Sequence, residues 1–197
     1  MKRIICMLLL LSSIFAFCEA SGESVSGIRD LFQVPAVTST PAPNAFRFRD
    51  GIRWGMNTQQ VKALETSPMT ERAMQNWSIM LTDAKVSVSR FAADLVFMFL
   101  EDRLQMISYE FPNGSAEDFL YLSGALASVY GEKQEAEPQK IKTLMDLVNP
   151  NRYKTELIAQ AHGWKTGDGT LVYLYYFSPD TFAILYVSPG IYQTNGL

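Results

Sequence analysis

The sequence predicts an α+β fold, with helices packed on one face of an antiparallel sheet in two helix-plus-hairpin halves. Three observations lead to this prediction. The patterns run in the order helix, strands, helix, short helix, strands. Tight turns join neighbouring strand-like runs, which favours antiparallel pairing. Two of the helical patterns begin with a capping sequence. We expect one domain over residues 46–190 and a C-terminal tail over residues 191–197.

The first ordered element is expected to begin near residue 46. In FRFRD (residues 46–50), aromatic residues alternate with arginines, which is the period of a strand with one side in water. Asn57 then has the pattern of a helix N-cap, with Gln60 as its capping-box partner, and Pro68 ends the helix. Trp54 stands just ahead of this cap. We therefore expect Trp54 to fold onto the first helical turn as part of the architecture.

Three strands are predicted next, at residues 86–91, 94–100 and 103–111, because these runs are rich in β-branched and aromatic residues. The Glu101-Asp102 pair is the expected tight connection between the last two. This part of the sheet should be antiparallel.

A second helix and a short third helix should follow these strands. Ser115 is the predicted N-cap of the second helix, with Asp118 as a looser capping-box partner, and Gly131 is its natural C-terminal cap. The third helix is expected over residues 141–148. The apolar residues of the second helix recur at helical spacing: Phe119, Leu122, Leu126, Val129 and Tyr130.

A hairpin formed by residues 171–177 and 181–187 completes the domain. Both runs are apolar on both faces, so we expect them to be covered on both sides or to pair at the centre of the sheet. The Asp168-Gly169 pair ahead of the hairpin is expected to form a turn.

The N-terminal residues are typical of a secretory signal peptide. Lys2 and Arg3 precede an apolar run from Ile4 to Phe17, which is shorter than the roughly 20 residues needed to span a bilayer. We expect cleavage after Ala20, so that the mature chain begins at Ser21. The chain should therefore be exported, as a periplasmic or secreted protein.

Residue Cys18 offers an alternative, a lipid-modified N-terminus, but the bulky Phe17 before it argues against a lipid anchor. Residues 21–45 are rich in Ser, Thr, Pro and Gly and read as a flexible linker. If cleavage follows Ala20, both cysteines, Cys6 and Cys18, are removed with the leader. An apolar core would then hold the mature domain, without disulfides.

The charge balance argues against a nucleic-acid partner. The chain has 17 basic and 20 acidic residues, and removal of residues 1–20 takes away Lys2, Arg3 and Glu19. The 15 basic and 19 acidic residues that remain give a net charge of −4, which provides no basic patch for phosphates. No later run is long and apolar enough to span a membrane.

The chain also lacks the common catalytic and metal-binding motifs. His162 is the only histidine, so without a mature cysteine a His/Cys zinc site is excluded. A Ser-His-Asp triad would have to use His162, and there is no Gly-x-Ser-x-Gly elbow or phosphate-binding glycine loop. We expect no metal and no cofactor. Carboxylate chemistry is left open, because any two acidic residues can meet in the fold.

One segment resembles a known family. WGMNTQQVKALE (residues 54–65) is similar to the helix opening of the small outer-membrane assembly lipoproteins of the SmpA/OmlA (BamE) type, through Gly55, Met56 and Val61. The same helix-then-sheet unit occurs twice in the β-lactamase-inhibitor-protein fold. The final hairpin and the string Tyr130-Gly131 also resemble uncharacterised exported bacterial proteins. The resemblance implies an envelope or secreted protein-binding module without chemistry of its own.

Aromatic residues are the best candidates for a binding surface, namely Trp54, Trp164, Tyr173 and Tyr175, which could line a groove for a peptide or a sugar. Ordinary sheet packing is the alternative explanation for them. The sequence thus favours an exported, non-catalytic protein-interaction module with another envelope or extracellular protein as partner. Two other functions are left open: a carboxylate-dependent hydrolase and a carrier of a small apolar ligand.

Overall fold

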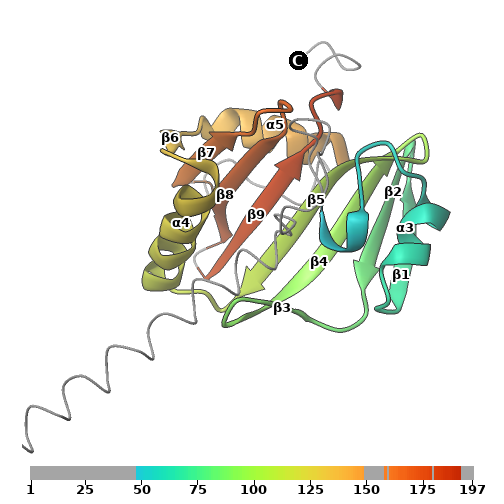
Figure 1. The fold of residues 1–197 in the computed structure, drawn as a ribbon, viewed down its shortest axis with the longest axis horizontal. Helices are drawn as coiled ribbons and strands as arrows, with labels where there is room; N and C mark the ends of the chain where they lie inside the picture. The colour runs from blue at the N-terminus through green and yellow to red at the C-terminus, as the bar shows by residue number, and fades with distance from the viewer. Residues whose placement is uncertain (1–47, 149–157, 159, 179, 192–197) are drawn as a thin grey trace, which may run out of the picture.

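The computed structural model describes residues 48–148, 158, 160–178 and 180–191. These residues form one antiparallel sheet of nine strands with helices on both of its faces (Figure 1). The strands follow the order β1-β2-β4-β5-β9-β8-β7-β6, and β3 pairs with β4. The predicted signal peptide and linker, with Cys18, Ala20 and Ser21, lie outside the described residues.

The bounds of the elements agree with most of the sequence predictions. The helices are α3 (Thr58–Leu64), α4 (Ala116–Tyr130) and α5 (Pro138–Val148), and a 3-10 turn, η1, spans Arg49–Gly51. The strands are β1 (Met69–Met74), β2 (Trp77–Thr82), β3 (Val86–Val88), β4 (Phe91–Leu100), β5 (Arg103–Pro112), β6 (Gln134–Glu135), β7 (Ala161–Lys165), β8 (Leu171–Ser178) and β9 (Thr181–Val187).

The sheet separates two apolar cores, because successive side chains of a strand point to opposite faces. In β9, the even-numbered residues from Phe182 to Tyr186 join one core and the odd-numbered residues from Ala183 to Val187 join the other. We call the first the front core and the second the back core, after their places in Figure 1. Helices α3 and α4 contribute to the front core, and α5 contributes to the back core.

The prediction that the helices pack on one face is therefore wrong for α5. Its inner side chains Ile141, Leu144 and Met145 are buried at the back of the sheet, opposite α4. The reason lies in β8 and β9, which are apolar on both faces and lie inside the sheet, so each face needs a cover. The expectation that this hairpin is covered on both sides is confirmed.

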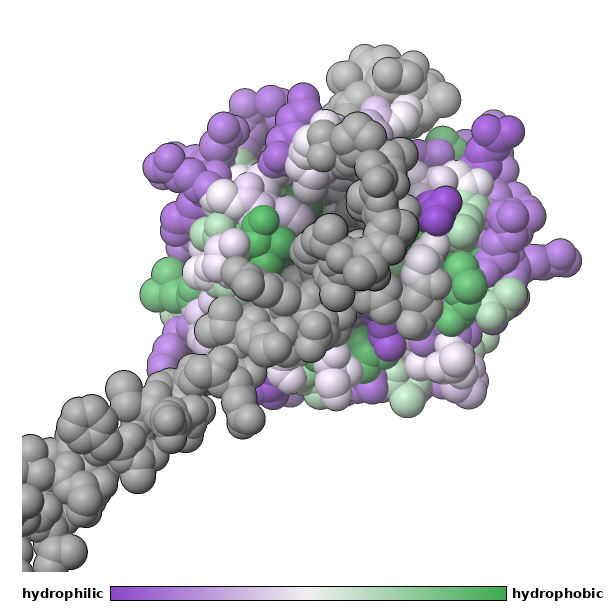
Figure 2. All heavy atoms as spheres, viewed as in Figure 1, coloured by the Kyte–Doolittle hydropathy of each residue, from purple (hydrophilic) through white to green (hydrophobic). Residues whose placement is uncertain are grey.

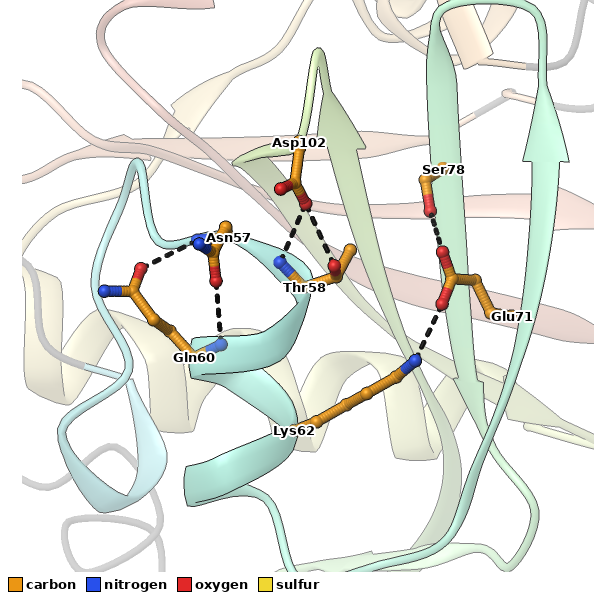
Figure 3. A network of polar contacts seen from close by, with 7 residues as sticks. All are labelled: Asn57, Thr58, Gln60, Lys62, Glu71, Ser78 and Asp102. Atoms are coloured by element: carbon orange, nitrogen blue, oxygen red, sulfur yellow. Dashed lines mark hydrogen bonds and ion pairs between the residues drawn. The ribbon is translucent and has the colours of Figure 1, made fainter.

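The N-terminus of α3 carries two caps (Figure 3). The Asn57 side chain accepts a hydrogen bond from the Gln60 amide at 2.8 Å, and Gln60 Oε1 accepts from the Asn57 amide at 3.0 Å, which confirms the predicted capping box. Asp102 Oδ1 accepts from the Thr58 amide at 3.0 Å and from the Thr58 hydroxyl at 2.9 Å. The β4–β5 turn therefore caps a helix that is distant in sequence.

This second cap explains an unusual turn. Glu101 and Asp102 form the predicted β4–β5 connection, and both have positive φ, at 50° and 56°. Such turns favour Asn and Gly at these positions, because other side chains are strained there. A side-chain oxygen at position 102 is needed to accept the two hydrogen bonds that Thr58 donates, so the capping role accounts for an acid at this strained position.

The same close-up shows how α3 is joined to the edge of the sheet. Lys62 Nζ donates to Glu71 Oε2 at 2.7 Å, and the Ser78 hydroxyl donates to Glu71 Oε1 at 3.0 Å (Figure 3). The bond from Lys62 is the main reason that the pKa of Glu71 lies below its usual range, and the bond from Ser78 acts in the same direction. This network ties α3 to both β1 and β2.

The sequence patterns missed the β1–β2 hairpin. Four consecutive residues of β1, from Thr70 to Ala73, are exposed, because β1 is the edge strand and buries little. The strand prediction for FRFRD is wrong for its described residues: Arg49–Gly51 form η1, which is closed by a bridge between Phe48 and Ile52. A positive φ of 86° at Gly51 helps the chain to turn here.

In the second half of the domain, the predicted caps of α4 are confirmed. Ser115 and Asp118 form a capping box, and Gly131 has a φ of 91° at the C-cap. The Asp168-Gly169 pair lies in the β7–β8 turn, as predicted. Ile191, one residue beyond the predicted end of the domain, is fully buried in the back core.

Candidate functional site

The four aromatic candidates from the sequence do not line one surface. Trp164 is buried in the front core, whereas Tyr173 and Tyr175 are buried in the back core. The Trp164 indole donates to the carbonyl of Gly131 at 3.0 Å, so it closes the end of α4. These three residues are part of the sheet packing that the sequence offered as the alternative explanation.

Trp54 is half-buried against the front core. Its indole N–H donates to the Thr170 hydroxyl at 2.9 Å, and that hydroxyl donates to Asp168 Oδ2 at 3.2 Å. The next residue, Gly55, has a φ of 80°, and its amide donates to the Leu104 carbonyl at 3.0 Å. Trp54 therefore ties the segment before α3 to the β7–β8 turn, in keeping with an architectural role.

The outward face of α4 is the most distinctive surface of the described residues. Its inner face buries Phe119, Leu122 and Leu126 in the front core. The chain has no charged residue from 119 to 131, so the opposite side of the helix is uncharged after its first turn, which carries Glu117 and Asp118. Leu120, on that side, is 58% exposed, the only large hydrophobic residue among the described ones with so open a position. We define the α4 face by its exposed residues Leu120, Gly124 and Ser128.

A space-filling view shows the same contrast. Pale and green side chains gather over α4 on the left of the molecule, with hydrophilic side chains around the margins (Figure 2). On one flank, Arg90 forms an ion pair with Asp118 at 3.1 Å and lies over the Tyr121 ring at 4.3 Å. The pKa of Asp118 is lowered mainly by its capping bonds from Ser115. The α4 face thus has a fixed, polar border.

His162 lies beneath α4 in a buried polar contact that the sequence did not predict. Its Nδ1 is 2.8 Å from the Ser123 hydroxyl, and its Nε2 is 3.4 Å from Lys133 Nζ. The Phe119 ring packs 5.2 Å away. Burial lowers the pKa of His162, and Lys133 lowers it further, although Glu135 acts in the opposite direction. The imidazole is therefore neutral at pH 7.

The partners of this imidazole make a poor catalytic dyad. A Lys133 ammonium can only donate, so Nε2 must accept and the single ring proton must lie on Nδ1. Nδ1 then donates to the Ser123 oxygen, which leaves no base to remove the serine proton. In addition, Ser123 is only 3% exposed. The Ser123–His162–Lys133 contact is best explained as a link between α4 and β7.

A second polar group joins η1 to the C-terminal end of α3, beside the front core. Arg49 Nη1 is 3.6 Å from Glu65 Oε2, and their side chains are 25% and 1% exposed. Glu65 is the C-cap of α3, and its other oxygen accepts from the Ser67 amide at 3.1 Å. The expectation that Arg49 lies on a solvent-facing strand is wrong, because its guanidinium turns toward this buried carboxylate.

Three tyrosines extend this group across the sheet, and we call Arg49, Glu65, Tyr109, Tyr130 and Tyr186 the polar centre. Burial raises the pKa of Tyr109 and Tyr186, and it raises the pKa of Tyr130 to about 12, so all three hydroxyls are protonated at neutral pH. The Tyr130 and Tyr186 hydroxyls interact with each other, and Tyr109 faces both Arg49 and Glu65.

Comparison with known proteins does not assign a family. No protein-family model, no curated protein and no solved structure matches this chain. The resemblance of residues 54–65 to the outer-membrane assembly lipoproteins therefore stays a prediction.

No described helix is long and apolar enough to cross a membrane. Within the same residues, no three His, Cys, Asp or Glu side chains are grouped so that they could hold a metal ion.

Proposed function

We propose that this chain is an exported, non-catalytic protein-interaction module of the cell envelope or the secreted fraction, and that it binds its partner through the α4 face. The observation that supports this proposal is the neutral outer side of α4, with Leu120 at 58% exposure. A surface helix usually carries charged or polar residues on its outer side, whereas a helix that is hydrophobic all round is buried. The outer side of α4 lies between these cases, because it joins Leu120 to the uncharged Gly124 and Ser128.

The α4 face is also suited to association on energetic grounds. Charged residues are depleted at the centres of protein interfaces, because their desolvation is costly. A partner that covers Leu120, Gly124 and Ser128 would remove apolar surface from water without stripping water from a charge. The capped, buried inner face of α4 holds this surface in a fixed position, which reduces the entropy lost on binding.

Export is the second part of the proposal and rests on the N-terminal pattern. Cleavage after Ala20 would give a mature chain that begins at Ser21. Intact-mass measurement of the exported protein tests this, and the expected mass is that of residues 21–197. A mass that retains Cys18 with an attached lipid would instead make the protein membrane-anchored.

Site-specific photo-cross-linking tests the interaction surface. A photoreactive amino acid replaces Leu120 on α4 or, as a control, the exposed Lys140 on α5, and the protein is irradiated in cells of the producing organism. We expect a discrete protein adduct from position 120 and none from position 140. Equal adducts at both positions, or none at position 120, would contradict the proposal. An adduct with a second copy of the chain would identify the partner as the chain itself.

A further inference from the structure

Strand β1 forms one edge of the sheet, and α4 lies near the opposite end, against β7 (Figure 1). The Pro68 carbonyl, just before β1, accepts a hydrogen bond from the Asp83 amide at 2.8 Å. Hydrogen-bonded pairs alternate along an antiparallel ladder, so the even-numbered residues of β1 direct their backbone groups toward β2. The N–H and C=O groups of Glu71 and Ala73 therefore point away from the sheet, and no described strand pairs with them.

This edge has few of the features that usually protect a sheet from further pairing, which are bulges, prolines and charged side chains. Strand β1 contains no proline, and its register with β2 is uninterrupted, whereas the pairing of β4 with β5 contains a register shift. The Glu71 carboxylate is already bound by Lys62 and Ser78 (Figure 3). Arg72 is exposed and makes no side-chain contact of its own with the described residues. The free charge of this edge is therefore positive.

A second copy of the chain fits this edge poorly. Two copies that pair antiparallel about a two-fold axis keep the faces of their sheets aligned, so each residue lies opposite one of the same parity. A pair centred on Glu71 would set two Glu71 carboxylates opposite each other, and a pair centred on Arg72 would do the same with two guanidinium groups. Like charges directly opposite each other destabilise a strand pair. The edge therefore favours a strand from a different protein.

The side chains of β1 indicate which strand fits best. An acidic residue opposite Arg72 would form a cross-strand ion pair. Ala73 is exposed and carries only a methyl group, so it leaves room for a β-branched residue opposite it. Antiparallel pairing reverses the chain direction, so this residue comes directly before the acid. The contacts of Glu71 hold β1 in place before binding, which reduces the entropy lost on association.

We propose that the outer edge of β1 binds an extended peptide segment of another protein as an added antiparallel strand, and that this segment has a β-branched residue followed by an acidic one. Backbone hydrogen bonds with Glu71 and Ala73 supply the affinity, and the ion pair with Arg72 selects the segment. This site is distinct from the α4 face and does not depend on it.

Peptide titrations followed by amide chemical shifts in NMR spectra of the full chain test this site. The acidic probe is the blocked heptapeptide acetyl-TTVDTVT-amide, and lysine replaces the aspartate in the basic probe. Two further probes carry N-methyl groups on the backbone. One has them on both residues that flank the aspartate, whose N–H groups would face β1, and the other has one on the aspartate, whose N–H would face away.

Three variants of the chain complete the experiment. Ala73→Pro removes an outward N–H but no hydrogen bond to β2, and proline is tolerated at such a position of an edge strand. Arg72→Glu reverses the free charge. Lys165→Glu is the matched control, because it makes the same change of charge at an exposed residue of β7, at the other end of the sheet. Thermal melts establish that each variant is folded, and Arg72→Glu keeps the test decisive if the proline variant does not fold.

We expect the acidic probe to shift the amide signals of Glu71 and Ala73. It should bind the parent about fivefold more tightly than the basic probe does, the factor for replacing a repulsive cross-strand pair with an attractive one. Arg72→Glu should reverse this preference, and Lys165→Glu should keep it. Ala73→Pro should abolish binding, as should N-methylation on both sides of the aspartate, whereas N-methylation of the aspartate itself should not.

Three results would overturn the proposal: no shift of these amide signals at millimolar acidic probe, equal binding of the two N-methylated probes, or an unchanged preference in Arg72→Glu. Sedimentation of the parent and Ala73→Pro tests the other occupant. A dimer of the parent that is lost in Ala73→Pro would assign the edge to a second copy of the chain and would also overturn the proposal.

Discussion

Helices α4 and α5 pack on opposite faces of one sheet, yet their outer sides differ. Both bury an apolar inner side, with Leu126 of α4 and Leu144 of α5 almost inaccessible. On its outer side α5 carries the exposed Lys140, and a half-buried Lys142–Asp146 ion pair lies on the same helix, whereas α4 carries no charge after Asp118. Because the inner side of each helix is already buried in a core, the uncharged outer surface of α4 is not needed to fold the domain. The comparison therefore separates a structural helix from a helix that presents a surface.

The largest expected effects test whether the two inner sides are equivalent. Leu126→Ala in α4 and Leu144→Ala in α5 should each lower the free energy of unfolding by about 2–5 kcal/mol, because each leaves a cavity in a packed core. Urea unfolding measures both. Ser128→Ala, on the outer side of α4, is the control and should stay within about 0.5 kcal/mol of the parent. If Leu126→Ala alone lowered the free energy of unfolding by less than about 1 kcal/mol, the burial of the inner side of α4 in the front core would be contradicted.

Smaller changes in the free energy of unfolding are expected from two glycines of this region. Gly114 precedes the N-cap of α4, and Gly124 lies within the helix. A Cβ on Gly114 would lie 2.0 Å from a ring carbon of Phe182, so Gly114→Ala should destabilise the fold by about 1–3 kcal/mol. A methyl group at Gly124 would meet no described atom within 4 Å, so Gly124→Ala should stabilise α4 by about 0.5–1 kcal/mol. Measured by urea unfolding, the two changes in the free energy of unfolding should have opposite signs. Changes of the same sign would contradict the placement of α4 described above.

The contact under α4 predicts a pH dependence of stability. The pKa of His162 is lowered below its ordinary 6.5 in the folded state, mainly by burial. The unfolded chain therefore binds a proton at higher pH than the folded chain, so this stabilisation is fully present above 6.5 and is lost as the pH falls through the folded value. Unfolding free energies measured from about pH 7.5 to about pH 5 should fall in the parent.

The variant His162→Gln supplies the control for this pH dependence. In this variant the free energy of unfolding should not fall between about pH 7.5 and about pH 5. The carboxyl groups of Glu71 and Asp118 do not contribute there, because their lowered pKa values mean that they titrate at more acidic pH. Because His162 is the only histidine in the chain, its NMR titration can be assigned without ambiguity. An imidazole pKa at or above 6.5 would contradict the burial argument.

Much of the fold could be predicted from local sequence signals. The caps at Asn57 and Ser115, the turn at Glu101-Asp102 and the doubly apolar final hairpin all depend on a few neighbouring residues, and the structure has each of them. The position of α5 could not be predicted with the same ease. Its own pattern gives an apolar side but does not say which face of the sheet that side covers.

The candidate sites were harder to predict, because they depend on residues that are distant in sequence. Arg49 and Glu65 meet Tyr109 only after β5 has paired within the sheet, and alternation in FRFRD indicated the wrong environment for Arg49. The α4 face had a sequence signal, the uncharged run from 119 to 131, which is visible once the helix is known to lie at the surface. The aromatic residues chosen from the sequence serve mainly the cores.

The most direct test of the central claim compares one outer residue of each helix. Leu120→Lys on α4 and Lys140→Ala on α5 should both leave the free energy of unfolding within about 0.5 kcal/mol of the parent, because both side chains are exposed. Calorimetry with the partner identified by cross-linking should then show that Leu120→Lys weakens binding by at least about tenfold, since it places a charge at the centre of the interface. Lys140→Ala should bind as the parent does. Parent-like affinity in Leu120→Lys would contradict the claim that α4 presents the binding surface.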